Sequence, residues 1–347
     1  MMDASGKCKE GAKFNSGAFG CRDKIAAMRC LPLLLSMLLL PMPESHAAQF
    51  PGVDVFIDEM VQRHQFERTY LESAFASAQH RPSIIAAMSR PYTRKPWPEY
   101  RATVVEPRRI RRGLAFWQQH RDTLARAEQR YGVPAEIVVA LIGIETVYGR
   151  NVGKVPTLDA LATLAFDYPR RAEFFRGELE QFLLLVREQQ LDVLTVQGSY
   201  AGALGMPQFM PGSYRRYAVD FDQDGRADLL TDADDVIGSV ANYLYQFGWK
   251  QGEPVAVRSR DLLGEGDKTP RPLAEWSGIG VTPLEPVAAL DASQAATLLE
   301  FTLAEGRESW LAFGNFGVIT RYNNSNYYAM SVFQLAEELK RAFYAPQ

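Results

Sequence analysis

Apolar residues three and four positions apart recur along most of the chain, and this spacing restricts it to a mainly helical fold. Such helices must bury their apolar faces against one another or against a sheet. Four prolines favour a loop over residues 90–107, and Gly132 followed by Pro134 marks the end of one helix and the start of the next. The spacing predicts helices over residues 53–64, 67–78, 108–130, 157–166, 169–189, 232–246 and 325–343.

The pattern changes after Trp249, where short β-prone runs at 254–257 and 298–303 are separated by Gly and Pro. These runs predict a small β-rich domain, so the fold class that we expect is α+β and mostly α. The boundaries that we expect are an α domain at 48–132 completed by 335–347, a central core at 133–249 and 310–334, and the β-rich domain at 250–309.

The first 47 residues have the pattern of a secretory signal, in which basic residues precede an apolar stretch at 31–40. This stretch is shorter than the roughly 20 apolar residues that a membrane-spanning helix needs. Ser45 and Ala47 supply small residues at the −3 and −1 positions of a cleavage site. We therefore expect residues 1–47 to be removed, with Met28 as the more compact start of the signal. The alternative is an uncleaved segment that anchors the protein in the inner membrane.

Composition excludes several classes of function. Cys8, Cys21 and Cys30 all lie in the segment to be removed, so no cysteine remains for disulfides, zinc binding or thiol catalysis. Lys and Arg total 38 against 41 Asp and Glu, and this balance argues against nucleic acid as a partner. A cysteine-free exported chain is typical of the Gram-negative periplasm. We expect a protein that is soluble after signal cleavage, with peripheral attachment at the outer membrane as an alternative.

One acidic residue, Glu145, lies in an apolar helix predicted over 134–149. Apolar residues stand four and seven positions before it, so its carboxylate shares a face with apolar side chains. Burial raises the pKa of a carboxyl group, and a raised pKa suits a general acid that works near neutral pH. Glu136, near the helix start, complements the helix dipole. The alternative for Glu145 is an ion pair in the core with a residue such as Arg150.

Two further segments combine polar side chains with a backbone suited to close contact. The loop predicted at 198–212 is rich in Gly, which lets the backbone approach a ligand closely, and it contains Ser199 and Gln208. Residues 320–328 bring Tyr and Asn together before a helix. Tyr rings pack on sugar faces, and amides bond hydroxyl and acetamido groups. The alternative for the segment 198–212 is a tight loop that only connects helices. The alternative for the tyrosines is simple packing in the core.

Five segments, in the same order along the chain, resemble motifs of the lytic murein transglycosylases of the B type, both soluble and membrane-bound. The resemblance extends over nearly all of the chain after residue 47 and is weakest at 253–310. It implies a lysozyme-like catalytic core, an α domain and a small β domain. The motifs are Ile-Glu-Thr-Val-Tyr-Gly-Arg at 144–150, the segment 158–175, the loop 198–212, the segment 237–243 and Arg-Tyr-Asn at 321–323.

The resemblance places Glu145 at the position of the family's single catalytic acid/base. It implies an enzyme, a lyase that cleaves the β-1,4 bond between N-acetylmuramic acid and N-acetylglucosamine in peptidoglycan and forms 1,6-anhydromuramic acid. Glycan strands are then the binding partner, other cell-wall enzymes are further candidate partners, and we expect a monomer. The residues that match positions lining the family's glycan cleft are Tyr100, Ser199, Gln208, Tyr243, Tyr322, Asn323 and Tyr328.

Two other functions remain as alternatives. A hydrolytic muramidase would cleave the same bond with water and would need a second, suitably placed carboxylate. A non-catalytic peptidoglycan-binding scaffold protein predicts loss of the acid, whereas Glu145 is present together with its surroundings.

An acidic segment at 220–228 matches an EF-hand loop at positions 1, 3, 5, 6 and 9. Alternating carboxylates with a turn-forming Gly suit a hard cation that prefers oxygen ligands. Position 12 is Thr231 rather than Glu. In the resembling family the last ligand comes later, where Asp235 aligns best and Asp232 or Asp234 is the alternative. The resemblance implies a structural Ca²⁺ ion held by Asp220, Asp222, Asp224, the Arg226 carbonyl and Asp235. A solvated acidic turn is the other interpretation.

Overall fold

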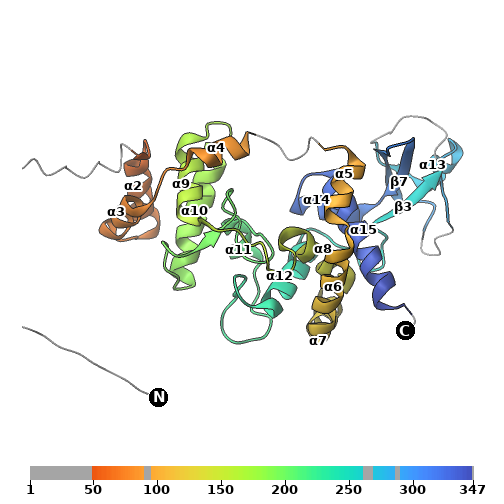
Figure 1. The fold of residues 1–347 in the computed structure, drawn as a ribbon, viewed down its shortest axis with the longest axis horizontal. Coiled ribbons are helices and arrows are strands. Elements are labelled where there is room, and N and C mark those ends of the chain that lie inside the picture. Colours follow the sequence, from red (N-terminus) through yellow and green to blue (C-terminus); the bar gives the residue numbers. More distant parts are fainter. Residues whose placement is uncertain (1–48, 90–94, 261–268, 286–289, 346–347) are drawn as a thin grey trace, which may run out of the picture. The chain divides into compact units, whose positions relative to one another are not determined.

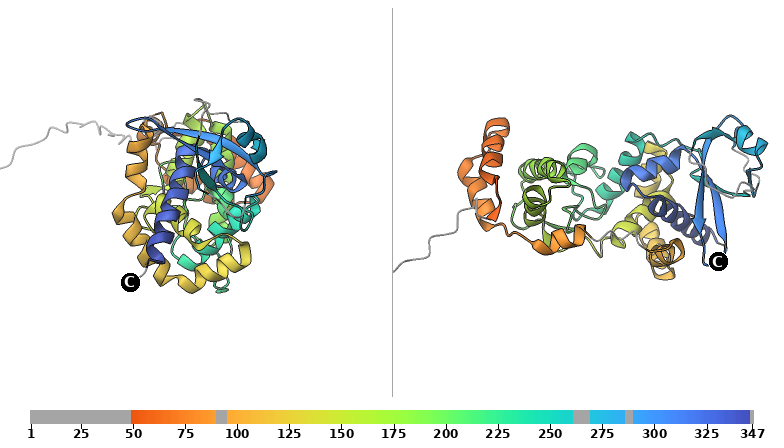
Figure 2. Two further views of the ribbon diagram at one scale, coloured as in Figure 1. Left: turned by 90° about the vertical axis from the view of Figure 1, so that its right-hand side faces the viewer. Right: turned by 90° about the horizontal axis from the view of Figure 1, so that it is seen from above.

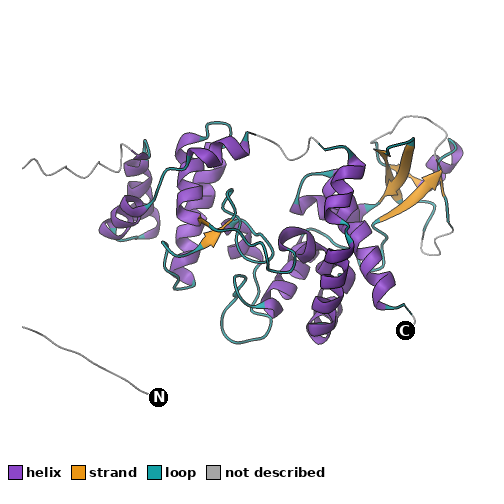
Figure 3. Ribbon diagram, viewed as in Figure 1, coloured by secondary structure: helices purple, strands orange, loops and turns teal. Residues whose placement is uncertain are grey.

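Helices make up most of the structure (Figure 1, Figure 3). It is a computed structural model that describes residues 49–89, 95–260, 269–285 and 290–345. Strands form a small antiparallel sheet and a two-stranded ladder, so the prediction of an α+β, mostly α fold is confirmed. Within the described ranges, no helix combines the length and the apolar character that crossing a membrane requires. The predicted signal, residues 1–47, lies outside these ranges.

One group of helices packs around the consecutive helices α9 and α10. At the end of α2, Arg63 and His64 both bond the Glu180 carboxylate of α10, at 2.9 and 2.7 Å. Just before α4, Arg81 Nε donates to Asp159 Oδ2 of α9 at 2.7 Å. These contacts fix the N-terminal helices to the middle of the chain. The group comprises α2 (Val53–His64), α3 (Arg68–Ser77), α4 (Pro82–Met88), α9 (Thr157–Asp167), α10 (Ala172–Glu188) and α11 (Pro211–Tyr217).

A second group is centred on α8, which packs against α6, α7, α12 and α15. Nearly every residue of α8 is buried, as expected of a helix that is apolar on all sides. Near its start, Glu136 accepts a hydrogen bond from Lys340 Nζ of α15 at 2.9 Å. The group comprises α5 (Trp97–Val104), α6 (Pro107–Gln119), α7 (Arg121–Tyr131), α8 (Ala135–Thr146), α12 (Ala233–Gln246), α14 (Gly314–Tyr322) and α15 (Asn326–Phe343).

The loop predicted over 90–107 is wrong in its second half, because residues 97–104 form α5. Pro96 directly precedes this helix and Pro98 lies in its first turn, where the missing N–H costs no hydrogen bond. Prolines at a helix start were therefore misread as helix breakers. Residues 90–94 of the predicted loop lie outside the described ranges.

The single helix predicted over 108–130 is also wrong, because it is broken at His120 between α6 and α7. His120 leaves helical geometry with φ of −111° and ψ of 28°. Its ring packs on Phe116 with centroids 4.6 Å apart, and its Nδ1 lies 3.5 Å from Asp234 Oδ1 at the start of α12. The break lets α7 pack against α12, a tertiary contact that helical periodicity does not encode.

The β-prone region forms an antiparallel sheet in the order β4-β6-β7-β3-β5 (Figure 2). Trp276 of α13, Leu298 and Leu311 belong to a small core of their own on this sheet. Strand β7 runs to Ala312, past the boundary expected at 309, and the domain boundaries otherwise stay predictions. The elements are β3 (Ala256–Arg260), β4 (Arg271–Pro272), α13 (Leu273–Gly278), β5 (Thr282–Pro283), β6 (Ala295–Thr302) and β7 (Arg307–Ala312).

Candidate active site

Glu145 lies in the last turn of α8 and faces the first turns of α15. The hydroxyl of Tyr328 donates a hydrogen bond to Glu145 Oε1 at 2.5 Å. Tyr328 is only 3% exposed, whereas the Glu145 side chain keeps partial access to solvent. Arg150, considered as an ion-pair partner, is exposed. Within the described residues, Glu145 has a phenol and no cation as its bonded partner.

Burial raises the pKa of Glu145 to about 7, and the hydrogen bond from Tyr328 lowers it in part. The two effects oppose each other because desolvation favours the neutral acid, while a donated hydrogen bond favours the carboxylate. Burial, together with the Glu145 charge, raises the pKa of both Tyr322 and Tyr328 well above the ordinary value, so both remain neutral phenols. Near neutral pH, Glu145 is thus populated both as an acid and as a base.

The turn that follows Glu145 fixes the end of α8 against the Gly-rich loop. Val147, Tyr148 and Gly149 have positive φ angles of 53°, 60° and 78°, a conformation that is uncommon for side-chain-bearing residues and that clusters at functional sites. Thr146 Oγ1 donates to the carbonyl of Met206 at 2.8 Å and accepts from Gly149 N at 3.0 Å. The reversal of the chain therefore occurs directly beside the acid.

Tyr148 occupies the space that two glycines leave open. Its ring stacks on Phe116 with centroids 5.4 Å apart, and its hydroxyl lies where a Cβ on Gly113 or Gly143 would be. Either glycine replaced by alanine would collide with this ring, so both are required by packing. The Tyr148 ring in turn supports the strained turn after Glu145.

Three predicted cleft tyrosines form one cluster next to Glu145. Tyr322 stacks on Tyr328 with centroids 6.5 Å apart and meets the ring of Tyr243 edge-on at 5.0 Å. Tyr243 donates to the carbonyl of Arg321 at 2.7 Å, and Tyr322 donates to that of Pro207 at 2.5 Å. Their hydroxyls are thus held by protein atoms. Tyr243 and Tyr328 are only 7% and 3% exposed, so the cluster is a largely buried support beside Glu145.

The Gly-rich loop is ordered by its own polar side chains. It starts at β2 (Gln197–Gly198), which pairs with β1 (Val155–Pro156). Ser199 Oγ accepts from Ala203 N at 3.0 Å. Gln208, with φ of 52°, donates through Nε2 to the carbonyls of Val152 and Gly205 at 3.1 and 2.8 Å. Both side chains stay partly exposed, so each still presents an oxygen to a ligand.

The two other predicted cleft residues differ in their surroundings. Tyr100 is on α5 rather than in a loop and is 8% exposed, with its ring centroid 5.7 Å from that of Tyr327. It is close enough to Tyr328 to act on its pKa. Asn323 follows α14 directly and is exposed. The structure therefore brings Glu145, Tyr100, Tyr243, Tyr322 and Tyr328 together and leaves Asn323 at the surface.

Two cavities adjoin the tyrosine cluster at Phe247, whose ring lies 4.6 Å from that of Tyr243. One, of ≈590 Å³, is bordered by Phe247 and Arg321, and the other, of ≈740 Å³, by Phe247, Tyr217 and Glu178. Burial raises the pKa of Glu178, whose carboxylate accepts from Gly212 N at 2.8 Å. Both cavities are thus bordered by Phe247, and neither is lined by Glu145 itself.

Three of the predicted metal ligands converge, namely Asp220, Asp222 and Asp235. One carboxylate oxygen from each lies within 4.8 Å of the others, and the donor set is all oxygen, which fits a hard cation such as Ca²⁺. Asp224 is turned to its own loop, where Oδ1 accepts from Arg226 N at 2.9 Å. Burial raises the pKa of Asp235, while hydrogen bonds from two backbone N–H groups lower it.

The two alternative last ligands are engaged elsewhere. Asp232 caps α12 by accepting from Asp234 N and Asp235 N. Asp234 Oδ2 accepts from Thr123 Oγ1 of α7 at 2.9 Å. Among the three candidates, Asp235 is the one whose carboxylate reaches the other acidic side chains.

Thr146 and Tyr148 set the geometry around Glu145 and were not among the predicted site residues. A usable signal was present, because two glycines, Gly113 and Gly143, interrupt otherwise regular helices at positions with no turn. Glycine inside a helix indicates a close approach by another group, here the Tyr148 ring.

Comparison with known proteins places the chain in one family. A family model described as "Transglycosylase SLT domain" matches residues 49–337. The chain is 44% identical over 308 residues to "Membrane-bound lytic murein transglycosylase B" of Escherichia coli K12, covering 85% of this chain and 84% of that protein.

Two solved structures resemble it along most of their length. The Escherichia coli lytic transglycosylase Slt35 in complex with calcium is 43% identical, with a TM-score of 0.79 over 88% of this chain and 99% of that chain. SltB3 from Pseudomonas aeruginosa, in complex with NAG-anhNAM-pentapeptide, is 32% identical. Its TM-score is 0.77 over 86% of this chain and 80% of that chain. The predicted lysozyme-like fold is confirmed by these neighbours. The chain therefore belongs to the SLT transglycosylase family and is a lytic transglycosylase.

Proposed function

We propose that this lytic transglycosylase cleaves peptidoglycan with Glu145 as its single acid/base. The observation that carries the proposal is a carboxyl group with a pKa raised to about 7 and no charged partner among the described residues. Burial and the hydrogen bond from Tyr328 are the influences on this pKa within the described part of the chain.

In the first step, protonated Glu145 gives its proton to the oxygen of the β-1,4 bond between N-acetylmuramic acid and N-acetylglucosamine, and the bond to C1 breaks. The acetamido carbonyl of the muramic acid stabilises the positive charge at C1. In the second step, ionised Glu145 takes the proton of the C6 hydroxyl of the same sugar. That oxygen bonds to C1, and 1,6-anhydromuramic acid results. Because one group both donates and accepts, a pKa near the working pH serves both steps.

The neighbouring residues would orient the sugar rings. Tyr243, Tyr322 and Tyr328, whose hydroxyls are already bonded to protein atoms, would form the base of the glycan site beside Glu145. Ser199 and Gln208 offer oxygens from the Gly-rich loop, and Tyr100 and Asn323 are further candidates for glycan contact. Attack by a hydroxyl of the same sugar gains from its high effective concentration, so no activated water is required.

The products test this assignment. Purified peptidoglycan sacculi digested with the enzyme should yield muropeptides ending in 1,6-anhydromuramic acid, which mass spectrometry identifies. Muropeptides heavier by one water and carrying a reducing end would instead identify a hydrolytic muramidase. No release of muropeptides by a folded protein would favour a non-catalytic binding protein. The Glu145→Gln variant is the control for contaminating activity.

We also propose a structural Ca²⁺ ion in the loop at 220–235. Asp220, Asp222 and Asp235 would supply carboxylate oxygens, and Asp224 and the Arg226 carbonyl are further candidate ligands. Supporting this are the all-oxygen donor set and the calcium bound by the Slt35 relative. When bound, the ion would tie the loop to the start of α12 and take no part in bond cleavage.

Thermal melts with chelator and with millimolar calcium test the ion. Extracytoplasmic calcium modules often have dissociation constants of about 10⁻⁴–10⁻³ M, so the wild type should melt several degrees higher with calcium. Asp222→Ala should lose most of that gain, because Asp222 is an exposed ligand whose removal leaves the core intact. Glu305→Ala, which removes an exposed carboxylate elsewhere, should respond as the wild type does. Identical wild-type melts in both conditions would leave a solvated acidic turn.

We further propose that the enzyme works in the periplasm as a soluble monomer, with glycan strands as its substrate and without a role for nucleic acid. Supporting this are the signal pattern at 1–47 and the peptidoglycan fragment bound by the SltB3 relative. Peripheral attachment to the outer membrane and contact with other cell-wall enzymes are compatible with this location.

A further inference from the structure

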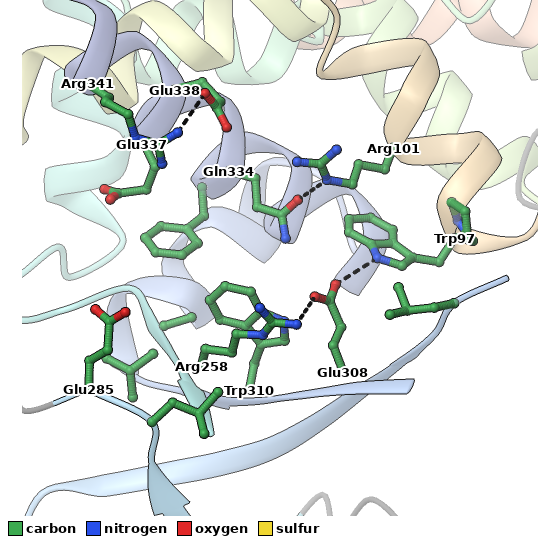
Figure 4. Close-up of a pocket in the computed structure, with 16 residues that line it drawn as sticks. Trp97, Arg101, Arg258, Glu285, Glu308, Trp310, Gln334, Glu337, Glu338 and Arg341 are labelled. Carbon is green, nitrogen blue, oxygen red and sulfur yellow. Dashed lines mark hydrogen bonds and ion pairs between the residues drawn. The ribbon is translucent and has the colours of Figure 1, made fainter. Parts of the chain in front are cut away.

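A cavity of ≈760 Å³ lies away from Glu145, between α5, α15 and strands β3 and β7 (Figure 4). Helix and sheet elements from four separate parts of the chain thus meet around it. Its volume is within the range of about 300–1,000 Å³ that is typical of ligand sites. The proposed glycan chemistry leaves this cavity without a role.

Aromatic side chains form one wall of the cavity. Trp310 of β7 and Phe333 of α15 meet edge-on with centroids 6.0 Å apart, and Trp97 of α5 lies beside them in the lining. Within the described residues, the indole Nε1 of Trp310 is enclosed and has no hydrogen-bond acceptor. This atom is buried below the cavity surface, so the wall offers a ligand its apolar ring faces, which suit the apolar side chain of an extended peptide.

Charged side chains of the lining divide into paired and unpaired groups. Glu308 accepts from Trp97 Nε1 at 3.0 Å and lies 3.7 Å from an Arg258 nitrogen. Arg341 donates to Glu338 at 3.0 Å. On α5, Arg101 is hydrogen-bonded to Gln334. Three of the cations that line the cavity are therefore already engaged by acceptors from this chain.

Two carboxylates remain, Glu285 and Glu337, and both are exposed. Neither forms a hydrogen bond or an ion pair within the described residues, although Lys340 and Arg341 act on Glu337 from the same helix. Figure 4 shows the two carboxylates on the same side of the cavity, opposite Trp97 and Arg101. That side therefore offers two carboxylates without a bonded partner next to aromatic rings, and Lys340 and Arg341 offset the charge of Glu337 only in part. Such a combination favours a cation.

We propose that this cavity binds an extended cationic segment of a partner protein, with a Lys or Arg beside an apolar residue. The apolar residue would pack on Trp310 and Phe333, and the cation would lie between Glu285 and Glu337. A peptidoglycan stem peptide fits less well, because its several carboxylates would meet the two glutamates. The site is separate from Glu145, so the proposal goes beyond the catalytic assignment.

Peptide binding to the mature protein tests this proposal. The probes are fluorescein-labelled synthetic hexapeptides that place lysine or arginine beside leucine, proline or tyrosine, with matched peptides carrying glutamate instead of the cation. Fluorescence anisotropy at low salt should show binding of the cationic set alone. The Glu285→Lys/Glu337→Lys double variant should weaken it by about tenfold or more, since a lost charge contact is of that size. Glu275→Lys, an exposed acid outside the cavity, should bind as the wild type does.

Peptidoglycan cleavage should be unchanged in all these variants, which separates failure of this site from failure of the active site. Equal binding of cationic and glutamate peptides, or unchanged binding by the double variant, would overturn the proposal. So would binding of purified stem peptides in place of the cationic set. Self-association of the wild type that the double variant abolishes would show that a second copy fills the cavity, and it would overturn the proposal as well.

Discussion

The two ends of α8 carry carboxylates in contrasting environments. Glu136, in the first turn, is 9% exposed and is bonded to Lys340 Nζ at 2.9 Å. Glu145, in the last turn, is bonded to the hydroxyl of Tyr328 at 2.5 Å. Both residues are on the same buried helix and both contact α15. They differ in the charge of the partner and in the end of the helix that they occupy.

This difference supports the proposal that Glu145, and not Glu136, is the acid/base. The helix dipole favours negative charge at the N-terminus and disfavours it at the C-terminus. Glu136 therefore lies at the favourable end of the dipole and beside a cation. Glu145 has neither, and burial raises its pKa to about 7. One helix thus holds an ion pair at one end and a carboxyl group with a raised pKa at the other.

The largest expected effect is a difference in enzymatic rate between two variants, each with one of these glutamates replaced by glutamine. Glu145→Gln should lower the rate of peptidoglycan cleavage by at least about 10²–10⁴-fold, because the amide keeps the shape of the side chain but cannot transfer the proton. Glu136→Gln, the matched control, should retain most of the rate. The measurement is release of muropeptides from sacculi at equal protein concentration.

Each outcome of that pair separates the two roles. A Glu145→Gln enzyme that keeps more than a tenth of the wild-type rate would contradict the acid/base assignment. If Glu145 were instead a packing residue, its substitution would lower the melting temperature and spare the rate.

The second prediction concerns stability and pH. The pKa of Glu145 is about 7 in the folded protein, against 4.5 for a freely solvated glutamate such as the unfolded chain exposes. Between these values the folded state binds more protons than the unfolded state, so stability must fall as pH rises from about 4.5 to 7. The full shift in the pKa of Glu145 corresponds to a change of at most about 3 kcal/mol in the free energy of unfolding. Glu145→Gln should lack this decline, so it should gain stability relative to the wild type towards neutral pH.

Urea unfolding of both proteins from pH 4 to 8 measures the effect as a difference, which cancels the other titrating groups. A difference that stays constant over this range would show that the Glu145 carboxyl is not perturbed. Glu136→Gln is the matched control, because it makes the same substitution on the same helix and leaves the Glu145 carboxyl in place.

The sequence was sufficient for helices such as α2, α10, α12 and α15, because their apolar residues recur at helical spacing. It also indicated that Glu145 shares a face with apolar side chains. The sequence was not sufficient where contacts between residues far apart in the chain determine the structure. The acceptor of the Tyr328 hydroxyl is 183 residues away in sequence, and the partner of Glu136 is 204 residues away. Short helices such as α4, α11 and α14 were missed for a related reason, since packing rather than periodicity stabilises them.

The acidic loop shows the same limit on a smaller scale. The resemblance favoured Asp235 as the last ligand and kept Asp232 and Asp234 as alternatives, because residue types alone do not separate them. Their roles are separated by the cap of α12, which uses Asp232, and by Thr123 of α7, which bonds Asp234. Neither the contact of Asp234 with α7 nor the capping of α12 by Asp232 can be derived from the spacing of the acidic residues.

The smallest effect should come from the ion pair at the start of α8. Lys340 is 52% exposed along its side chain, so solvent screens the pair, and exposed pairs contribute up to about 1 kcal/mol. A double-mutant cycle of Glu136→Gln and Lys340→Gln should therefore give a coupling free energy below about 1 kcal/mol that shrinks in high salt. A coupling several times larger would mean that Glu136 is held as strongly as a fully buried charge. The contrast between the two ends of α8 would then rest on the cation at Lys340 alone rather than on cation and dipole together.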